Sequence, residues 1–353
     1  MTRRVMVGGV PLGGGARVSV QSMTNTDTRD VPATLAQIRR LHEAGCDIVR
    51  VSVYDEACAK AVRALVDVSP VPLVADIHFD YRLAIASIEN GIAKVRINPG
   101  NIGGRENVRR LADCVKAHHV PLRVGVNAGS LERELLQKYG GPTAEALVES
   151  ALGQARMLED MDVHDIVLSM KASSVRTTVR AYRLAAASCD YPLHLGVTEA
   201  GTPEAGTVKS AVGIGSLLMD GIGDTIRVSL SGPPENEIPV CLDILRAVGA
   251  REEGVEVISC PTCGRTMIDV AGIADRVRRE TRGIKTPLKV AVMGCVVNGP
   301  GEAREADIGI AGGKDGGALF VKGKPVRKVT GDLAETLLSE IRRCLDEMTD
   351  KKD

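Results

Sequence analysis

The chain has 353 residues, and its 45 Lys and Arg residues balance 45 Asp and Glu residues, so the formal net charge is zero. This balance excludes a protein whose whole surface is organised around nucleic acid or an anionic membrane, and any anion-binding site must therefore be local. The sequence has no run of about 18 apolar residues, the length that a membrane-spanning helix needs. Nine cysteines, mostly scattered singly, form no disulfide pattern. We therefore expect a protein of the reducing cytoplasm, without a membrane or nucleic-acid partner.

Short β-branched runs alternate with amphipathic helical patterns from residue 18 to residue 231. The runs cover residues 18–23, 47–53, 73–78, 94–99, 122–127, 165–171, 193–199 and 225–231. Continuous hydrophobic runs with helices between them are typical of parallel strands that are covered on their outer faces. Eight such units predict a (β/α)8 TIM-type barrel, with an open doubly wound sheet as the alternative.

The remainder of the chain predicts a small α+β domain. The Arg-Glu-Glu-Gly stretch at 251–254 is the best hinge, so we expect a barrel domain over 1–252 and a second domain over 253–353. In the second domain the sequence predicts strands at 255–259, 288–293 and 308–311, a hairpin around 321–325, and helices at 268–279 and 333–348. This length suits a barrel of ~250 residues followed by a domain of ~100 residues.

Charged and polar residues occupy the ends of the predicted barrel strands, where barrel enzymes collect their chemistry. They are Arg50, Ser52, Asp76, His78, Arg96, Asn98, Arg123, Asn127, Ser169, Lys171, Thr198, Glu199, Arg227 and Ser229. Four arginines and a lysine facing two carboxylates leave a surplus of positive charge, which favours a multiply charged anion such as a diphosphate. Ion pairs that merely close the barrel are the alternative, because buried charges must be paired or used. Arg50 is the residue that best fits that alternative.

The predicted second domain contains three cysteines in a metal-binding pattern. Cys260 and Cys263 are separated by two residues, and Cys295 follows 32 positions later. No histidine follows Cys260, and the one later cysteine, Cys344, lies within a helical pattern, so Glu302 is the nearest candidate for a fourth ligand. Structural zinc sites prefer four thiolate or imidazole ligands. A catalytic [4Fe–4S] cluster, which tolerates one unusual ligand, therefore fits better than zinc or a purely structural cluster.

Several motifs together resemble one enzyme family. They are Cys260-Pro-Thr-Cys263-Gly-Arg265 with Cys295 and Val297-Asn-Gly-Pro-Gly-Glu302, and, in the barrel, Val20-Gln-Ser-Met-Thr24, Asp76-Ile-His78, Val95-Arg-Ile-Asn-Pro-Gly100, Arg123-Val-Gly-Val-Asn127 and Gly223-Asp-Thr-Ile-Arg-Val-Ser229. The set is similar to 4-hydroxy-3-methylbut-2-enyl diphosphate synthases, the iron–sulfur reductases of the methylerythritol phosphate pathway to isoprenoids. The resemblance spans nearly the whole chain and implies the short two-domain bacterial form.

The resemblance implies roles for individual residues. Cys260, Cys263 and Cys295 would be the thiolate ligands of a [4Fe–4S] cluster, and Glu302 would be its displaceable fourth ligand. The cyclic substrate, 2-C-methyl-D-erythritol 2,4-cyclodiphosphate, would be held by Arg50, Arg96, Asn98, Arg123, Asn127, Lys171, Ser229 and Asn298. Glu199 would protonate the leaving hydroxyl, or alternatively orient an arginine.

The resemblance also implies partners. Ferredoxin or flavodoxin would supply electrons, and two chains would form a homodimer in which each cluster domain caps the partner's barrel. Topology favours the same dimer, because the predicted eighth helix, 236–249, returns the chain to the barrel end opposite the strand-end residues. A metal-stabilised protein that binds a phosphorylated metabolite without chemistry is the alternative function.

Overall fold

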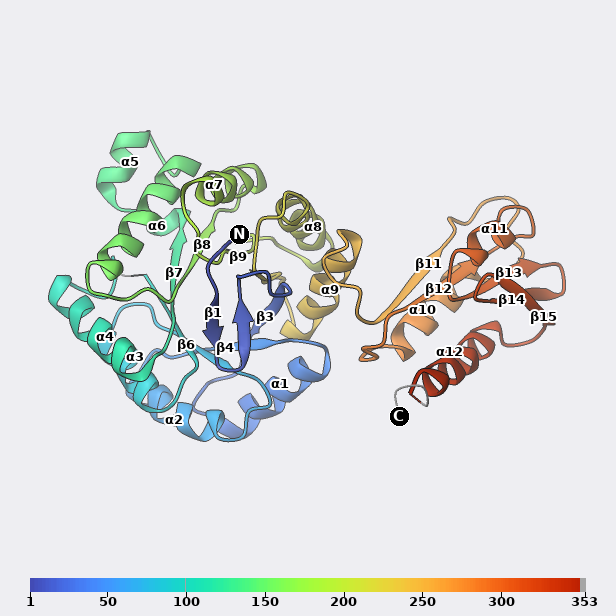
Figure 1. The fold of residues 1–353 in the computed structure, drawn as a ribbon, viewed down its shortest axis with the longest axis horizontal. Helices are drawn as coiled ribbons and strands as arrows, with labels where there is room; N and C mark the ends of the chain where they lie inside the picture. The colour runs from blue at the N-terminus through green and yellow to red at the C-terminus, as the bar shows by residue number, and fades with distance from the viewer. Residues whose placement is uncertain (99, 350–353) are drawn as a thin grey trace. The chain divides into compact units, whose positions relative to one another are not determined.

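A computed structural model of the chain describes residues 1–98 and 100–349. The chain divides into two compact units, Met1–Arg251 and a second that begins at Glu252 (Figure 1). Each unit has a hydrophobic core of its own. No helix within the described ranges is both long and apolar enough to cross a membrane.

The first unit is a barrel of eight parallel strands. They are β3 (Ser19–Met23), β4 (Ile48–Ser52), β5 (Leu73–Asp76), β6 (Lys94–Ile97), β7 (Leu122–Asn127), β8 (Ile166–Lys171), β9 (His194–Leu195) and β10 (Thr225–Ile226). The strand order is β8-β7-β6-β5-β4-β3-β10-β9. A parallel bridge between Leu168 and Leu193 joins the two outer strands of this order, so the sheet closes on itself. The predicted fold class is confirmed.

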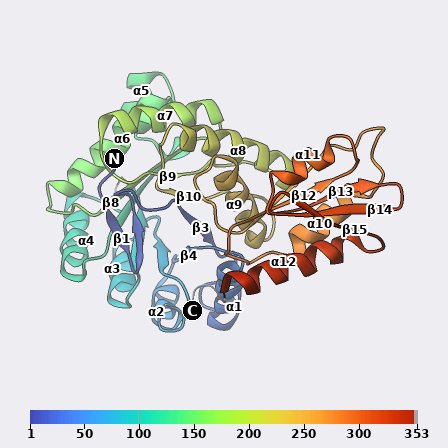
Figure 2. The same cartoon turned by 45° about the vertical axis from the view of Figure 1, so that its right-hand side comes forward.

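Helices cover the outside of the barrel (Figures 1 and 2). They are α1 (Val31–Glu43), α2 (Glu56–Val66), α3 (Tyr81–Glu89), α4 (Arg105–His118), α6 (Ala144–Glu159), α7 (Val175–Ser188), α8 (Pro203–Met219) and α9 (Glu237–Ala247), with η2 (Pro234–Asn236) before the last. Several begin at a side chain that accepts a backbone N–H bond, as Asp30, Asp55 and Ser174 do. Such caps satisfy amides that the helix itself leaves without partners. The loop after β7 carries the additional η1 (Ala128–Ser130) and α5 (Arg133–Tyr139).

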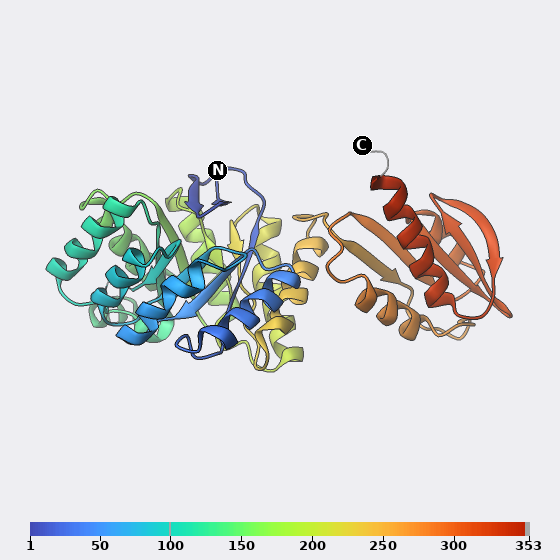
Figure 3. The same cartoon turned by 90° about the horizontal axis from the view of Figure 1, so that it is seen from below.

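An N-terminal hairpin, which the sequence analysis did not predict, closes one end of the barrel (Figure 3). Its strands are β1 (Val5–Val7) and β2 (Val10–Leu12), paired antiparallel. Val5, Val7 and Leu12 form a buried cluster with Ile48, Val74 and Val167, which project inward from the barrel strands. The hairpin therefore seals the N-terminal end of the barrel with apolar side chains.

Several predicted strands end earlier than the sequence suggested. The predicted strands over 193–199 and 225–231 reduce to two residues each, β9 and β10, because the chain leaves the extended conformation soon after pairing ends. Glu199 and Gly201 have φ angles of 52° and 104°, values that no strand accommodates. The predicted end of β6 at residue 99 lies outside the described residues.

The second unit is a five-stranded sheet with helices on both faces. Its strands are β11 (Val255–Ser259), β12 (Leu288–Met293), β13 (Ile308–Gly313), β14 (Gly316–Val321) and β15 (Lys324–Val329), in sequential order. The first three are parallel and the last two pairings are antiparallel. The helices α10 (Val270–Glu280) and α12 (Leu333–Thr349) pack on one face, and α11 (Gly299–Arg304) on the other. Asn298 is the N-cap residue of α11, which begins at Gly299.

Candidate functional site

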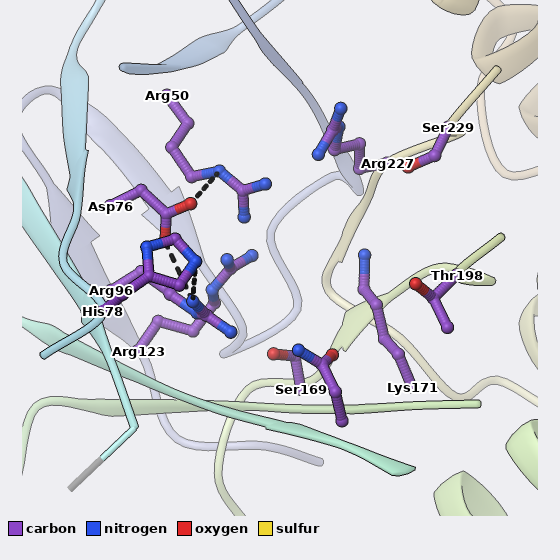
Figure 4. Close-up of a pocket in the computed structure, with 11 residues that line it drawn as sticks. Arg50, Asp76, His78, Arg96, Arg123, Ser169, Lys171, Thr198, Arg227 and Ser229 are labelled. Atoms are coloured by element: carbon purple, nitrogen blue, oxygen red, sulfur yellow. Dashed lines mark hydrogen bonds and ion pairs between the residues drawn. The ribbon is translucent and has the colours of Figure 1, made fainter. Parts of the chain in front are cut away.

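A cavity of about 150 Å³ lies at the C-terminal ends of the barrel strands (Figure 4). It is lined by Arg50, Asp76, His78, Arg96, Arg123, Asn127, Ser169, Lys171, Thr198, Arg227 and Ser229. Every lining residue lies within a barrel strand or in the loop that directly follows one, and Arg123, the second residue of β7, is placed deeper than the strand ends. Alternation along a strand explains this, because residues two apart face the same side.

Asp76 pairs with two arginines of the cavity. Its Oδ1 lies 3.1 Å from Arg96 Nη1, and its Oδ2 lies 3.6 Å from Arg50 Nε. Burial opposes ionisation of this carboxyl group, but Arg50, Arg96 and Arg123 outweigh it and lower the pKa of Asp76. The carboxylate is therefore charged at neutral pH and fixes two of the cations in place.

Arg123 and Lys171 are cations of the cavity for which the structure gives no carboxylate ion pair. Arg123 is only 1% exposed, and neither its Nε nor its Nη1 finds a hydrogen-bond acceptor among the described residues. Burial, followed by the nearby charges of Arg50 and Arg96, lowers the pKa of Arg123 well below its usual value. Burial and then Arg123 and Arg227 do the same to the pKa of Lys171. An anion between these side chains would relieve both effects.

Glu237 is a buried carboxylate at this site that strand-end reasoning missed. Its Oε2 accepts a hydrogen bond of 3.0 Å from Ser22 Oγ and lies 3.5 Å from Arg227 Nε. Its Oε1 accepts a bond from the Leu230 backbone N–H. Glu237 is the first residue of α9, so the signal in the sequence was an acidic residue at a helix start.

Two glycines make room for the cations. A Cβ atom at Gly125 would lie 2.6 Å from Arg96 Nε, and one at Gly196 would lie 2.5 Å from Lys171 Nζ. Real Cβ atoms do not approach other atoms so closely, so any other residue at either position would displace the neighbouring cation.

The structure brings six of the predicted substrate-binding residues together around the cavity, namely Arg50, Arg96, Arg123, Asn127, Lys171 and Ser229. It does not place Asn98 or Glu199 among the lining residues. The Asn98 Oδ1 instead accepts a bond from the Gly100 N–H, and Glu199 is exposed, in a left-handed backbone conformation. Asn298 is exposed in the second unit, immediately before α11.

The three predicted cysteine ligands follow two neighbouring parallel strands of the second unit. Cys260 comes directly after β11, and Cys295 follows β12 after one residue. The Gly294 N–H donates a 3.1 Å bond to Cys260 Sγ, which links the two loops. A Cβ atom at Gly294 would lie 2.8 Å from Thr266 and 2.9 Å from Val270, so a glycine is needed for this approach.

The surroundings of two of these sulfurs favour thiolates. Backbone N–H groups of Asn298 and Val297 lower the pKa of Cys295. The backbone and guanidinium of Arg265 lower the pKa of Cys263. Thiolate is the form that binds metal, so this donor set fits an iron–sulfur cluster.

Within the described part of the chain, no three His, Cys, Asp or Glu side chains converge on a point where they could hold a single metal ion. In an iron–sulfur cube each thiolate binds a different iron, so three thiolates need not converge. Glu302 is exposed and lies on α11, the short helix that follows Cys295 in the chain.

The fold and the cavity define a (β/α)8-barrel protein with a cation-rich cavity inside the barrel and a second domain that carries three cysteines after two neighbouring strands. Comparison with known proteins makes the assignment specific. The GcpE TIM-barrel domain family matches residues 2–242, and the GcpE C-terminal domain family matches residues 256–343. The chain belongs to the GcpE family, and the resemblance seen in its motifs is confirmed.

Relatives in this family carry a specific name. A "4-hydroxy-3-methylbut-2-en-1-yl diphosphate synthase (flavodoxin)" from Caldanaerobacter subterraneus subsp. tengcongensis is 59% identical over 98% of both chains. A protein of the same name from Clostridium perfringens is 59% identical over 96% of this chain and 98% of its own. Among solved structures, spore coat polysaccharide biosynthesis protein spsE from Bacillus subtilis covers 70% of this chain and 72% of its own at a TM-score of 0.51 and 13% identity. That likeness concerns the fold alone.

Proposed function

We propose that this protein catalyses the reductive ring opening and dehydration of 2-C-methyl-D-erythritol 2,4-cyclodiphosphate to (E)-4-hydroxy-3-methylbut-2-enyl diphosphate, a step in isoprenoid precursor synthesis. The observation that carries the proposal is the buried pair Arg123 and Lys171, cations given no carboxylate ion pair in a cavity at the barrel mouth. A diphosphate supplies the missing negative charge. The names of the full-length relatives agree with this chemistry.

The reaction balances as a two-electron reduction. One C–O bond between the carbon skeleton and the diphosphate breaks, one hydroxyl group leaves as water, and two electrons and two protons are consumed. The protein must therefore bind the diphosphate, exclude bulk water from the reacting carbons and deliver protons, while the electrons come from a bound cofactor.

The residues of the barrel cavity have different roles in binding the diphosphate. Arg123 and Lys171 bind diphosphate oxygens directly, because their charges are not already used in carboxylate pairs. Arg50 and Arg96 add further donors, with their positions fixed by Asp76. Asn127 and Ser229 supply neutral hydrogen-bonding groups to the same cavity. Asn98 would contact the substrate only if its loop rearranges when the substrate binds, and Asn298 would contact it from the second domain.

Proton delivery to the leaving hydroxyl falls to Glu199 in this proposal. Its exposed position outside the cavity lining requires that the loop after β9 turns inward when substrate binds. The left-handed φ of Glu199 and the adjacent Gly201 identify where this loop could change conformation. An alternative role is to orient an arginine of the closed site.

The second unit would hold a [4Fe–4S] cluster through Cys260, Cys263 and Cys295, with Glu302 as a fourth and weaker ligand. Such a cluster supplies electrons one at a time at low potential. Arg265 and the amides around Cys295 favour the thiolate forms that binding requires. A carboxylate ligand can be displaced by substrate oxygen more readily than a thiolate. Flavodoxin, which the relatives' names print, is the proposed electron donor, and ferredoxin is the alternative.

We further infer a cytoplasmic homodimer in which each cluster domain caps the partner's barrel. All nine cysteines are free, which suits a reducing compartment. The topology of the barrel supports this proposal, because α9 carries the chain away from the end of the barrel at which β10 delivers Ser229. A partner's cluster domain reaches that end more easily than the chain's own.

Genetic rescue tests the proposed activity. A bacterium whose own 4-hydroxy-3-methylbut-2-enyl diphosphate synthase is repressed should grow when this chain is expressed with a matching flavodoxin. Expression of Lys171→Ala at the same level should not restore growth, whereas the exposed-surface variant Lys60→Ala should. No growth with wild-type protein that is soluble and contains iron would contradict the proposal.

A further inference from the structure

A second polar layer lies inside the barrel, between the cavity and the hairpin that seals the other end. We call it the inner polar layer and define it as Ser19, Gln21, Lys94, Arg123, His194 and Thr225. Each of these residues is at most 1% exposed. Of the six, only Arg123 also lines the cavity.

Strand alternation places these side chains in the interior of the barrel. The neighbouring residues on the same strands, including Val20, Val95, Val124, Leu195 and Ile226, belong to the core packed beneath the outer helices. Successive side chains in a strand point to opposite faces. The strand register supports this interior placement, because Thr225 is paired with Ser19 on one neighbouring strand and with His194 on the other.

The inner polar layer is rich in buried polar atoms without hydrogen-bond partners among the described residues, and these include Ser19 Oγ, Gln21 Oε1 and Thr225 Oγ1 as well as donors. Lys94 Nζ, Arg123 Nε and Nη1, Gln21 Nε2 and both ring nitrogens of His194 are buried and without a hydrogen-bond partner in the described ranges. A buried polar atom left without a partner costs roughly 1–3 kcal/mol, and a charged one costs more. So many in one layer indicate that something other than a side chain occupies the space among them.

The charges of the inner polar layer indicate what kind of group occupies it. The layer contains two basic side chains, Lys94 and Arg123, and no carboxylate. The nearby carboxylate Asp76 already pairs with Arg50 and Arg96. Burial, and next the charge of Arg123, lowers the pKa of both Lys94 and His194 well below their usual values. Water would satisfy the hydrogen bonds but leave the charges uncompensated, whereas an anion would do both.

We propose that the inner polar layer binds one small monatomic anion of the halide class, with chloride as the physiological occupant. Lys94 Nζ, Gln21 Nε2 and Arg123 are its donors, and His194 is available as a fourth. A halide fits this position better than an oxyanion, because Gln21, Lys94 and His194 do not line the substrate cavity and a monatomic ion needs the least room among closely packed side chains.

The proposed anion has a consequence for the site above it. Arg123 belongs both to the inner polar layer and to the cavity lining. A halide below would stabilise its charged guanidinium and hold it in position to bind an anion from above. The inner site would therefore orient Arg123 without touching substrate. This inference does not depend on which anion the cavity accepts.

Crystals of the full-length protein grown or soaked in sodium bromide test the proposal directly. Bromide scatters anomalously, so its position is visible without any variant. We expect an anomalous peak among Lys94 Nζ, Gln21 Nε2 and Arg123. Anomalous peaks in the substrate cavity alone, with only water density within the inner polar layer, would overturn the proposal.

Two matched variants separate the inner site from the cavity. Lys94→Met replaces the ammonium group with a side chain of similar length, and the layer peak should disappear while bromide in the cavity remains. Lys171→Met should abolish the bromide peak in the cavity and leave the peak in the inner polar layer. If Lys94→Met fails to fold, Gln21→Leu provides a second variant, with a weakened layer peak expected.

Solution stability gives an independent measurement. At constant ionic strength, replacing sodium gluconate with sodium chloride should raise the unfolding temperature of the wild-type protein, because chloride binds the folded state alone. Lys94→Met should lose the part of this rise that the inner polar layer contributes, whereas Lys171→Met should lose only the part that the cavity contributes. An equal rise in Lys94→Met would place the stabilising chloride elsewhere and contradict the proposal.

Discussion

Lys171 occupies space that only a glycine at position 196 leaves open: a Cβ atom there would lie 2.5 Å from the lysine Nζ. The same Cβ would lie 2.8 Å from the backbone oxygen of Arg227. The position of the cation that we assign to the diphosphate thus depends on the absence of a single side chain on the adjacent strand.

Gly196→Ala should displace Lys171 and weaken binding of the cyclic diphosphate. We expect a loss of up to about 3 kcal/mol of binding free energy, the value for losing a hydrogen bond to a charged group. Isothermal titration calorimetry measures the affinity, and Gly153→Ala, whose added methyl meets nothing within 4 Å, is the matched control. Unchanged affinity in Gly196→Ala would mean that Lys171 does not bind the ligand from the position seen here.

Removing the cations themselves should have a similar effect. Lys171→Ala and Arg123→Ala should each weaken substrate binding by roughly 1.5–3 kcal/mol, as expected for hydrogen bonds to charged groups. Lys60→Ala, at an exposed position on α2, should bind normally. Full affinity in both cavity variants, with circular dichroism unchanged, would favour the alternative that the cations only stabilise the barrel.

Substrate binding should become weaker as pH rises. Burial and neighbouring cations lower the pKa of Lys171 in the free protein, and a bound diphosphate should raise it again because opposite charge favours the protonated form. Binding therefore takes up protons between the free and bound pKa values, and affinity falls as pH increases through that interval. Calorimetry in buffers of different ionisation enthalpy would detect the uptake.

Lys171→Arg provides the control for this pH dependence, since a guanidinium stays charged. The variant should take up fewer protons on binding. Equal proton uptake in wild type and Lys171→Arg would assign the titration to another group.

The cluster ligands should separate into two classes. Cys263→Ser should lose most of the iron, whereas Glu302→Ala should keep much of it and lose turnover, because three thiolates can still hold a cube. Iron and sulfide analysis under anaerobic conditions should give about four of each per wild-type chain. Cys114→Ser, on the barrel helix α4, should retain full iron content. A fully active Glu302→Ala would refute the displaceable-ligand assignment, and one zinc without iron in fresh wild-type protein would refute the cluster.

Mixed dimers test the proposed assembly. Inactive Cys263→Ser chains and inactive Lys171→Ala chains, mixed under conditions of subunit exchange, should regain activity. Each heterodimer would contain one site with an intact barrel and an intact partner cluster domain. Exchange without recovery would mean that each chain completes its own site.

Most of the fold could be predicted from the sequence, because in long helices and strands the spacing of apolar residues matches the positions that are buried. The strands β11 and β12 have the predicted bounds. The β1–β2 hairpin could not be predicted, because strands of three residues interrupted by Gly8 and Gly9 carry no detectable period.

Other features of the site depend on tertiary structure. Glu237 turns inward because α9 packs against the barrel, and nothing local to its sequence specifies that direction. The exposed position of Glu199 follows from a left-handed φ that a strand pattern does not reveal. The burial of Lys94 inside the barrel could not be predicted either, because the sequence pattern around a lysine on a strand is the same whether the lysine lies at the barrel mouth or in the barrel interior.

An anaerobic turnover assay is the most direct test of the proposed ring-opening reaction. Wild-type protein loaded with iron and sulfide is mixed with 2-C-methyl-D-erythritol 2,4-cyclodiphosphate and reduced flavodoxin, and the products are identified by mass spectrometry. The account predicts (E)-4-hydroxy-3-methylbut-2-enyl diphosphate, formed with two electrons per molecule, at a much lower rate with Lys171→Ala. Loaded wild-type protein that binds the cyclic diphosphate tightly but forms no ring-opened product would contradict it.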